Sequence, residues 1–125
     1  MGHQERLFPA SPAVLPAIRH WIEGLVAHAS FGDVKGEFAL AVSEAAANAI
    51  RHSGSSSLAV RWRSDGNQAI VEVSDQGVFD QQAITSGEVG GFGLPLMAAV
   101  MDEVSIERGS PERPGTMVRL VKRKP

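Results

Sequence analysis

The sequence predicts an α+β fold, a two-layer α/β sandwich in which a mostly antiparallel sheet is covered by helices on one face. Two long segments in the first half carry apolar residues at helical spacing. Two pairs of strand-like segments in the second half are each joined by a turn-rich connector, as in β-hairpins. The resulting order is strand, two helices, hairpin, long loop, helix and hairpin, which is typical of that class.

Composition predicts one domain over residues 1–125, because domains commonly span ~50–200 residues. The chain is 43% hydrophobic and 21% charged, with a formal net charge of −2, which disfavours nonspecific binding of nucleic acid. It contains no cysteine, which excludes disulfides, thiol nucleophiles and thiolate metal sites. No apolar run approaches the ~18 residues that span a bilayer, and residues 1–12 lack a leader pattern. We therefore expect a cytoplasmic protein without a membrane anchor.

The first half is predicted to form a short strand and two helices. The strand covers residues 6–8 at most, because prolines follow it. Apolar residues then recur at helical spacing over residues 14–26, with Ser11 as the N-cap. A second helix is predicted over Lys35–His52, ending at the break before Gly54.

The second half is predicted to hold two antiparallel hairpins separated by a short helix. The first hairpin turns at a Ser-Asp-Gly-Asn sequence, a strong turn signal. In order, the expected segments are strand 58–63, turn 64–67, strand 69–73, helix 94–101, strand 103–107 and strand 116–121. Residues 75–93 make a connector far longer than the usual ~4–6 residues, so we expect that loop to be functional or mobile.

A polar stripe on the second helix could hold a cation. Glu44, Asn48 and His52 follow one another at intervals of four and therefore share one side of the helix. Their neighbours are alanines, which leave room for a ligand. Carboxylate and amide oxygens suit a hard cation such as Mg²⁺. The solvated face of any amphipathic helix presents a similar stripe, so the spacing leaves both interpretations open.

Three further motifs could contact a ligand. Asp75 directly follows a strand and could accept a hydrogen bond from a ligand amine, while Gly77 permits close approach. Gly91 and Gly93 precede a helix, whose N-terminal N–H groups attract anions. Thr116 opens the last strand, where its hydroxyl could reach a buried acceptor. Each motif alone is also explained by a turn, a hinge or strand propensity.

The four motifs in this order resemble the GHKL ATPase superfamily of histidine kinases, gyrase and certain chaperones. Residues 43–52 look like its N box, and the Asp-Gln-Gly at residues 75–77 looks like its adenine box. Residues 91–94 resemble its second glycine box, and Gly115-Thr116 resembles its terminal signature. The resemblance covers about residues 5–122, whereas neither a P-loop nor a Rossmann fingerprint is present.

Within the superfamily, the chain is most similar to the anti-sigma-factor serine/threonine kinases. The short length, the Ser-Glu-Ala opening of the N box and the segments 101–104 and 115–120 carry this similarity. The adenine box of the family usually has a second glycine where this chain has Phe79, which puts the lid and the nucleotide affinity in doubt. The polar segment 81–90 is expected to close over the triphosphate as a lid.

The resemblance implies ATP and Mg²⁺ as cofactors and assigns roles to individual residues. Asn48 would hold the metal, and Glu44 would be the general base. The residues that would contact the nucleotide are Asn48, Arg51, Asp75, Gly77, Gly91, Gly93, Leu94 and Thr116. Arg51 would reach the phosphates, although an arginine late on a helix also favours the helix dipole.

The expected activity is phosphoryl transfer from ATP to a serine or threonine of an anti-anti-sigma (STAS-domain) protein, with reversible sequestration of an RNA polymerase sigma factor. The resemblance allows a homodimer. The alternative is a protein-binding module that senses ATP or ADP without phosphorylating its partner. A detached histidine-kinase catalytic domain is the poorest match, because no helical hairpin carrying a phosphoacceptor histidine is evident around His20 and His28.

Overall fold

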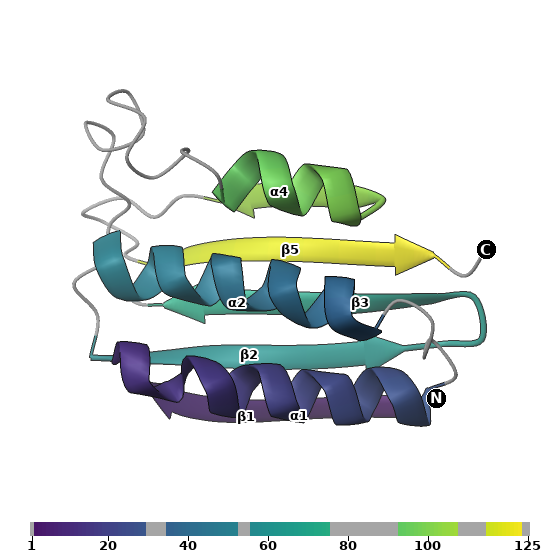
Figure 1. Ribbon diagram of the computed structural model, residues 1–125, viewed down its shortest axis with the longest axis horizontal. Helices are drawn as coiled ribbons and strands as arrows, with labels where there is room; N and C mark the ends of the chain where they lie inside the picture. Colours follow the sequence, from purple (N-terminus) through teal and green to yellow (C-terminus); the bar gives the residue numbers. More distant parts are fainter. Residues whose placement is uncertain (1, 30–34, 53–55, 76–92, 108–114, 124–125) are drawn as a thin grey trace.

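The computed structural model describes residues 2–29, 35–52, 56–75, 93–107 and 115–123 (Figure 1). Its elements, in order, are β1 (Gly2–Pro9), a 3₁₀ turn η1 (Pro12–Val14), α1 (Leu15–His28), α2 (Lys35–His52), β2 (Ser57–Ser64), β3 (Gln68–Asp75), α4 (Gly93–Val100), β4 (Glu103–Glu107) and β5 (Thr116–Arg123). The predicted order of helices and strands is confirmed. Gly77, Phe79, Gly91 and the expected lid at 81–90 lie outside the described residues.

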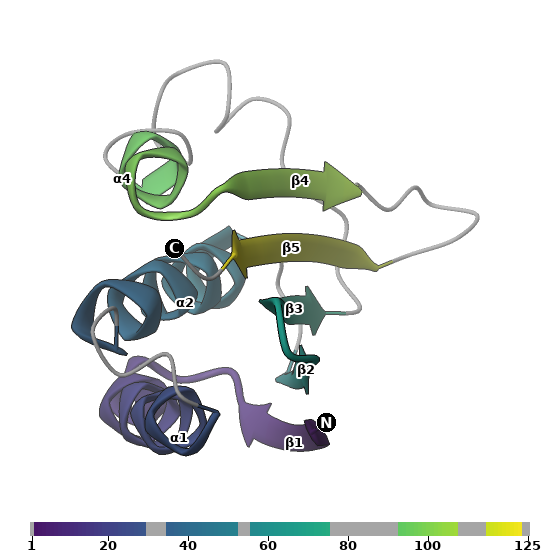
Figure 2. The same ribbon diagram turned by 90° about the vertical axis from the view of Figure 1, so that its right-hand side faces the viewer.

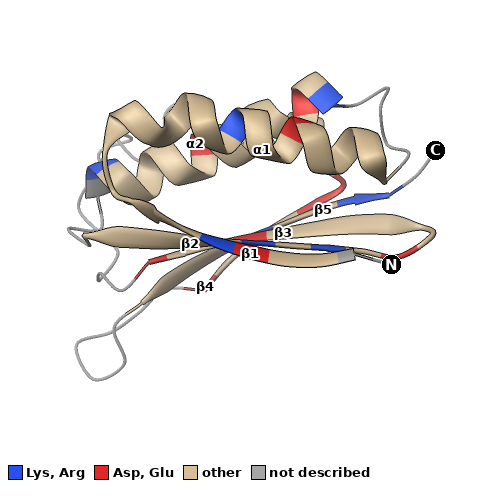
Figure 3. Ribbon diagram, turned by 90° about the horizontal axis from the view of Figure 1, so that it is seen from below, with Lys and Arg blue, Asp and Glu red and all other residues tan. Residues whose placement is uncertain are grey.

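The strands form one antiparallel sheet in the order β1-β2-β3-β5-β4. Both predicted hairpins are present, and β3 and β5 join them at the centre of the sheet. The described helices α1, α2 and α4 lie on one face, with α1 beside β1 and α4 beside β4, and no helix among the described residues covers the other face (Figures 2 and 3). The predicted two-layer α+β sandwich is confirmed.

The core lies between the sheet and the helices. Strand alternation turns Val60 and Trp62 of β2 toward the helices, where both are buried. Phe38 of α2 packs against Trp62, with ring centroids 5.6 Å apart. Apart from Phe38 and Val42, the buried apolar residues of α2 are alanines, which allow its backbone to approach its neighbours closely; they are Ala39, Ala41, Ala45, Ala46 and Ala49. No helix in the described ranges is both long and apolar enough to cross a membrane.

Strand β1 is longer than predicted. It was expected over residues 6–8, but it covers Gly2–Pro9 and pairs with β2 along its whole length. The reason is that β1 is an edge strand in which Phe8 alone among residues 3–9 is buried, so no apolar alternation marks it. Strand β5 also extends two residues beyond the prediction, to Arg123, whose N–H donates to the Asp102 carboxylate at 2.5 Å.

The turn signal works as the sequence predicts, but Ser11 is not the N-cap of the first helix: the N-cap of α1 is Val14, which makes no side-chain capping hydrogen bond. The Ser11 hydroxyl accepts the N–H of Ala13 at 3.4 Å and caps a 3₁₀ turn that leads into α1. Between β2 and β3, the Asp65 carboxylate accepts the N–H groups of Asn67 at 2.7 Å and Gln68 at 3.0 Å. These hydrogen bonds lower the pKa of Asp65, because they favour the charged carboxylate.

Candidate nucleotide site

Four element ends that are distant in sequence meet at one end of the molecule. These are the C-terminal end of α2, the end of β3, the start of β5 and the start of α4 (Figure 1). Helix α2 contacts β3, β5 and α4. The structure therefore brings Asn48, Asp75 and Thr116 to the same end, although each comes from a different element.

The stripe on α2 is not fully solvated. Asn48 is only 6% exposed, and Glu44, one turn earlier, is partly buried. A buried amide normally makes a polar contact, either within the protein or with a ligand. Arg51, one turn beyond Ala47, is exposed, and His52 ends the helix with a side chain outside the described set.

Ser43 forms a hydrogen bond within its own helix. Its hydroxyl donates to the Leu40 carbonyl at 2.9 Å, and the residue is buried. This is the local back-bonding that serine makes inside helices. The Ser-Glu-Ala opening of the motif therefore contains one residue that bonds to its own helix and one, Glu44, that remains partly accessible.

Asp75 and Thr116 lie directly opposite each other where β3 ends and β5 begins. Asp75 is 4% exposed and Thr116 is 3% exposed, and both have interaction partners. Burying a carboxylate is unfavourable unless hydrogen bonds compensate it. A buried carboxylate beside a buried hydroxyl provides the acceptor and the donor that recognition of an amine-bearing base requires.

Gly93 is the first residue of α4, so the helix begins one residue earlier than predicted. The first N–H groups of a helix have no partner within it and favour an anion such as phosphate. Helix α4 is held against the core by Met97, which is fully buried. Leu94 lies in the same first turn, but its side chain is outside the described set.

Gly115 has a backbone conformation that explains why a glycine precedes Thr116. Its φ is 130°, a conformation that L-residues with a side chain rarely adopt. This glycine sets the direction in which the chain enters β5 and therefore positions Thr116 opposite Asp75. The sequence showed only that a glycine precedes Thr116. The structure shows that this glycine adopts a positive φ.

Replacing Gly115 with alanine is expected to destabilise the fold by about 1–3 kcal/mol, because the side chain would hold a strained φ. Urea unfolding measures this effect. Gly24→Ala in α1 is the matched control: an added Cβ meets nothing within 4 Å. That change should stabilise the fold by about 0.5–1 kcal/mol. The same sign for both substitutions would contradict the backbone role of Gly115.

The described residues of this end offer few oxygens to a metal ion. Among the described residues, no three His, Asp or Glu side chains cluster as a metal site. Mg²⁺ commonly takes one or two protein oxygens and completes its shell with phosphate and water. Asn48, with a nearby carboxylate at Glu44, fits that mode of binding.

Comparison with known proteins agrees with this arrangement. Residues 8–122 match the family described as histidine kinase-like ATPase domain. The fold is similar to the crystal structure of the RsbU and RsbW domains of Rv1364c from Mycobacterium tuberculosis, with a TM-score of 0.73 and 19% sequence identity. That likeness covers 98% of this chain and 32% of the other, so this chain spans about a third of its length. No curated protein matches the sequence significantly. The chain belongs to the histidine kinase-like ATPase family, as its four motifs predicted.

Proposed function

We propose that the chain is a magnesium-dependent, ATP-binding regulatory kinase of the anti-sigma type. It would phosphorylate a serine or threonine of an anti-anti-sigma (STAS-domain) protein and reversibly sequester a sigma factor, in the cytoplasm. The observation that carries the proposal is the meeting of buried Asn48, Asp75 and Thr116 at one end of a histidine kinase-like ATPase fold. The RsbW domain of the structural neighbour supports the choice of subtype.

In this proposal the nucleotide binds with its base at the strand ends. The Asp75 carboxylate accepts the adenine amino group, and Thr116 supports the same end. The backbone at Gly77 lines the base, and Gly91 and Gly93 approach the phosphates, with Leu94 beside them. Arg51, exposed near the end of α2, extends toward the phosphates.

The transfer step is assigned to the middle of α2. Asn48 would hold Mg²⁺, which neutralises the charge that develops on the phosphates when it is bound. Glu44 removes the proton of the substrate hydroxyl as its oxygen forms a bond to the γ-phosphorus and the bond to ADP breaks.

Calorimetry with ATP, ADP and GTP, each with and without Mg²⁺, tests the nucleotide site. ATP and ADP are expected to bind at about micromolar Kd, equivalent to about −8 kcal/mol, with full strength only in the presence of Mg²⁺. GTP should bind more weakly, because guanine presents a carbonyl oxygen where adenine presents an amino group. An absence of both heat and thermal stabilisation with ATP and ADP would remove the proposed site.

A further inference from the structure

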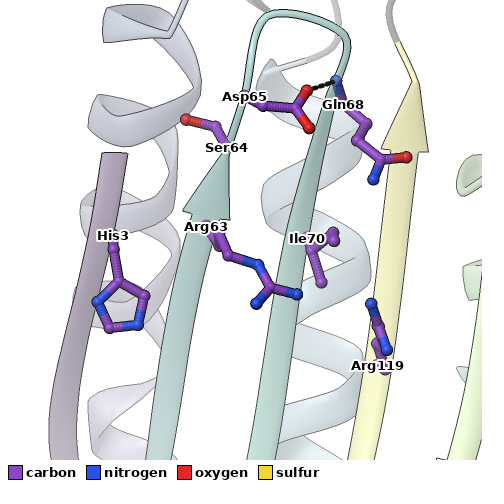
Figure 4. A pocket seen from close by; sticks show the side chains of 7 residues that line it. All are labelled: His3, Arg63, Ser64, Asp65, Gln68, Ile70 and Arg119. Atoms are coloured by element: carbon purple, nitrogen blue, oxygen red, sulfur yellow. Dashed lines mark hydrogen bonds between the residues drawn. The ribbon is translucent and has the colours of Figure 1, made fainter. Parts of the chain in front are cut away.

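We propose a second ligand site on the face of the sheet that carries no helices: a groove that binds a small organic oxyanion of the phosphate monoester class. The groove has a volume of about 470 Å³ and is lined by His3, Arg63, Ser64, Asp65, Gln68, Ile70 and Arg119 (Figure 4). It lies on the opposite face from the helices, and hence from Asn48, so it is independent of the proposed ATP site.

Strand alternation places two arginines on this face. Trp62 and Ser64 of β2 are buried toward the helices, so Arg63 projects to the other side. The buried Val118 and Leu120 place Arg119 of β5 on that same side. Strand β3 runs between them, and its Ile70, the register partner of Arg63, forms the floor of the groove between the two guanidinium groups (Figure 4).

Arg119 has a donor that the fold does not use. Its Nε atom is buried and has no hydrogen-bond partner among the described residues. A buried N–H without an acceptor is unfavourable and uncommon in folded proteins. Its register neighbour Glu72 makes no ion pair with it within the described part of the chain. Arg119 also lines the groove and has no ion-pair partner among the described residues, so an oxyanion there would give its guanidinium a counter-charge.

The other cations of this face are already neutralised. Arg61 pairs with Glu5, and Arg123 pairs with Glu103 at 2.6 Å. In the described ranges neither Arg63 nor Arg119 has such a pair. The acid that lines the groove, Asp65, accepts two N–H groups of its own turn. The groove is therefore lined by two arginines without ion-pair partners and by His3. Its one carboxylate, Asp65, already accepts hydrogen bonds from its own turn.

The size and lining of the groove indicate which organic group is attached to the anion. Arginine guanidinium groups bind phosphate and carboxylate oxygens in pairs and stack on planar groups. A volume of about 470 Å³ is in the range of small-molecule sites and exceeds the size of inorganic phosphate. The buried Ile70 gives an apolar floor. A phosphate ester with a small apolar or planar body matches both properties.

The hollow continues on the other side of Arg119. A neighbouring groove shares Gln68, Ile70 and Arg119 and extends toward Asp102 and Glu103 on the β4 side. Two carboxylates there disfavour an anion. The phosphate group should therefore lie on the Arg63 side of Arg119, with the body of the ligand over Ile70.

The test follows the arginine side chains by NMR in the full-length ¹⁵N-labelled protein. Phenyl phosphate is expected to shift the Nε–Hε signal of Arg119 saturably and to bind about tenfold more tightly than inorganic phosphate, because the groove removes its apolar ring from water. Equal affinity for the two probes would overturn the ester class. An absence of saturable shift at Arg119 up to millimolar phenyl phosphate would overturn the site. A shift confined to Arg51 would place the anion at the proposed ATP site and would also overturn the inference.

Two variants separate a specific contact from a general effect of charge. Arg119→Met keeps the apolar stem and should weaken phenyl phosphate about tenfold. Arg61→Met removes one positive charge from the same face, at a residue already paired with Glu5, and should leave the affinity within twofold. Equal losses in both variants would overturn the site.

A third variant and a dilution series complete the test. Should Arg119→Met not fold, Arg63→Met at an exposed position carries the same expectation. An Arg119 signal that follows protein concentration rather than the anion would assign the groove to a second copy of the chain and overturn the proposal.

Discussion

Glu44→Gln is expected to reduce phosphate transfer to the antagonist by about 10²–10⁴-fold while leaving ATP affinity within a few-fold. Glu44 lies one helical turn before Asn48 and is only partly buried, so its carboxylate is accessible to a substrate hydroxyl. A general base accepts the proton of the substrate hydroxyl in the transition state and contributes little to nucleotide binding in the ground state. Glutamine keeps the shape of the side chain and removes its basicity.

The measurement is transfer of labelled phosphate from ATP to a cognate antagonist, run beside nucleotide binding on the same proteins. Glu37→Gln is the matched control, because Glu37 is an exposed acid in the first turn of α2 and should leave transfer unchanged. If the wild type binds an antagonist but transfers no phosphate, the nucleotide-sensing module becomes the better explanation. If Glu44→Gln also abolishes ATP binding, Glu44 belongs to the metal shell and is not the base.

Asp75→Asn is expected to weaken ATP and ADP binding by about 1–3 kcal/mol, because a buried acceptor for the adenine amino group is lost. The substitution should also reduce the preference for ATP over GTP, since an asparagine amide can donate to the carbonyl of guanine. Calorimetry on the variant and the wild type measures both effects.

Asp65→Asn is the control for Asp75→Asn. Asp65 is an exposed aspartate in the β2–β3 turn, which adjoins the opposite end of β3 from Asp75. Nucleotide affinity should be unchanged in this variant. Equal binding of ATP by Asp75→Asn and the wild type would exclude Asp75 from the site, whatever the result for Glu44.

Most of the fold follows from local signals in the sequence. Helix α2 has the predicted bounds, Lys35–His52, because its apolar spacing is regular and a Ser-Gly break follows it. The β2–β3 hairpin forms where the Asp-Gly turn indicates. The full length of β1 could not be predicted, because its pairing with β2 stabilises polar residues that have no strand pattern of their own.

The candidate site was predictable in its residue types but not in its assembly. The motifs name Asn48, Asp75 and Thr116, yet the direct opposition of Asp75 and Thr116 depends on β3 lying next to β5. Local sequence patterns predict hairpins between consecutive strands, but they do not predict that β3 pairs with β5. The unused donor of Arg119 likewise arises from tertiary packing. The roles of Gly77, Gly91 and the lid at 81–90 stay predictions.

The pairing of β3 with β5 also bears on how the protein folds. These central neighbours are separated in sequence by a helix and an edge strand, so their contact closes a long loop and is entropically unfavourable until the sheet is nearly complete. Asp75 and Thr116 face each other at the end of this pair. A ligand that contacts both therefore binds only a chain whose two hairpins are already joined. Bound nucleotide would hold the two hairpins together and stabilise the folded state.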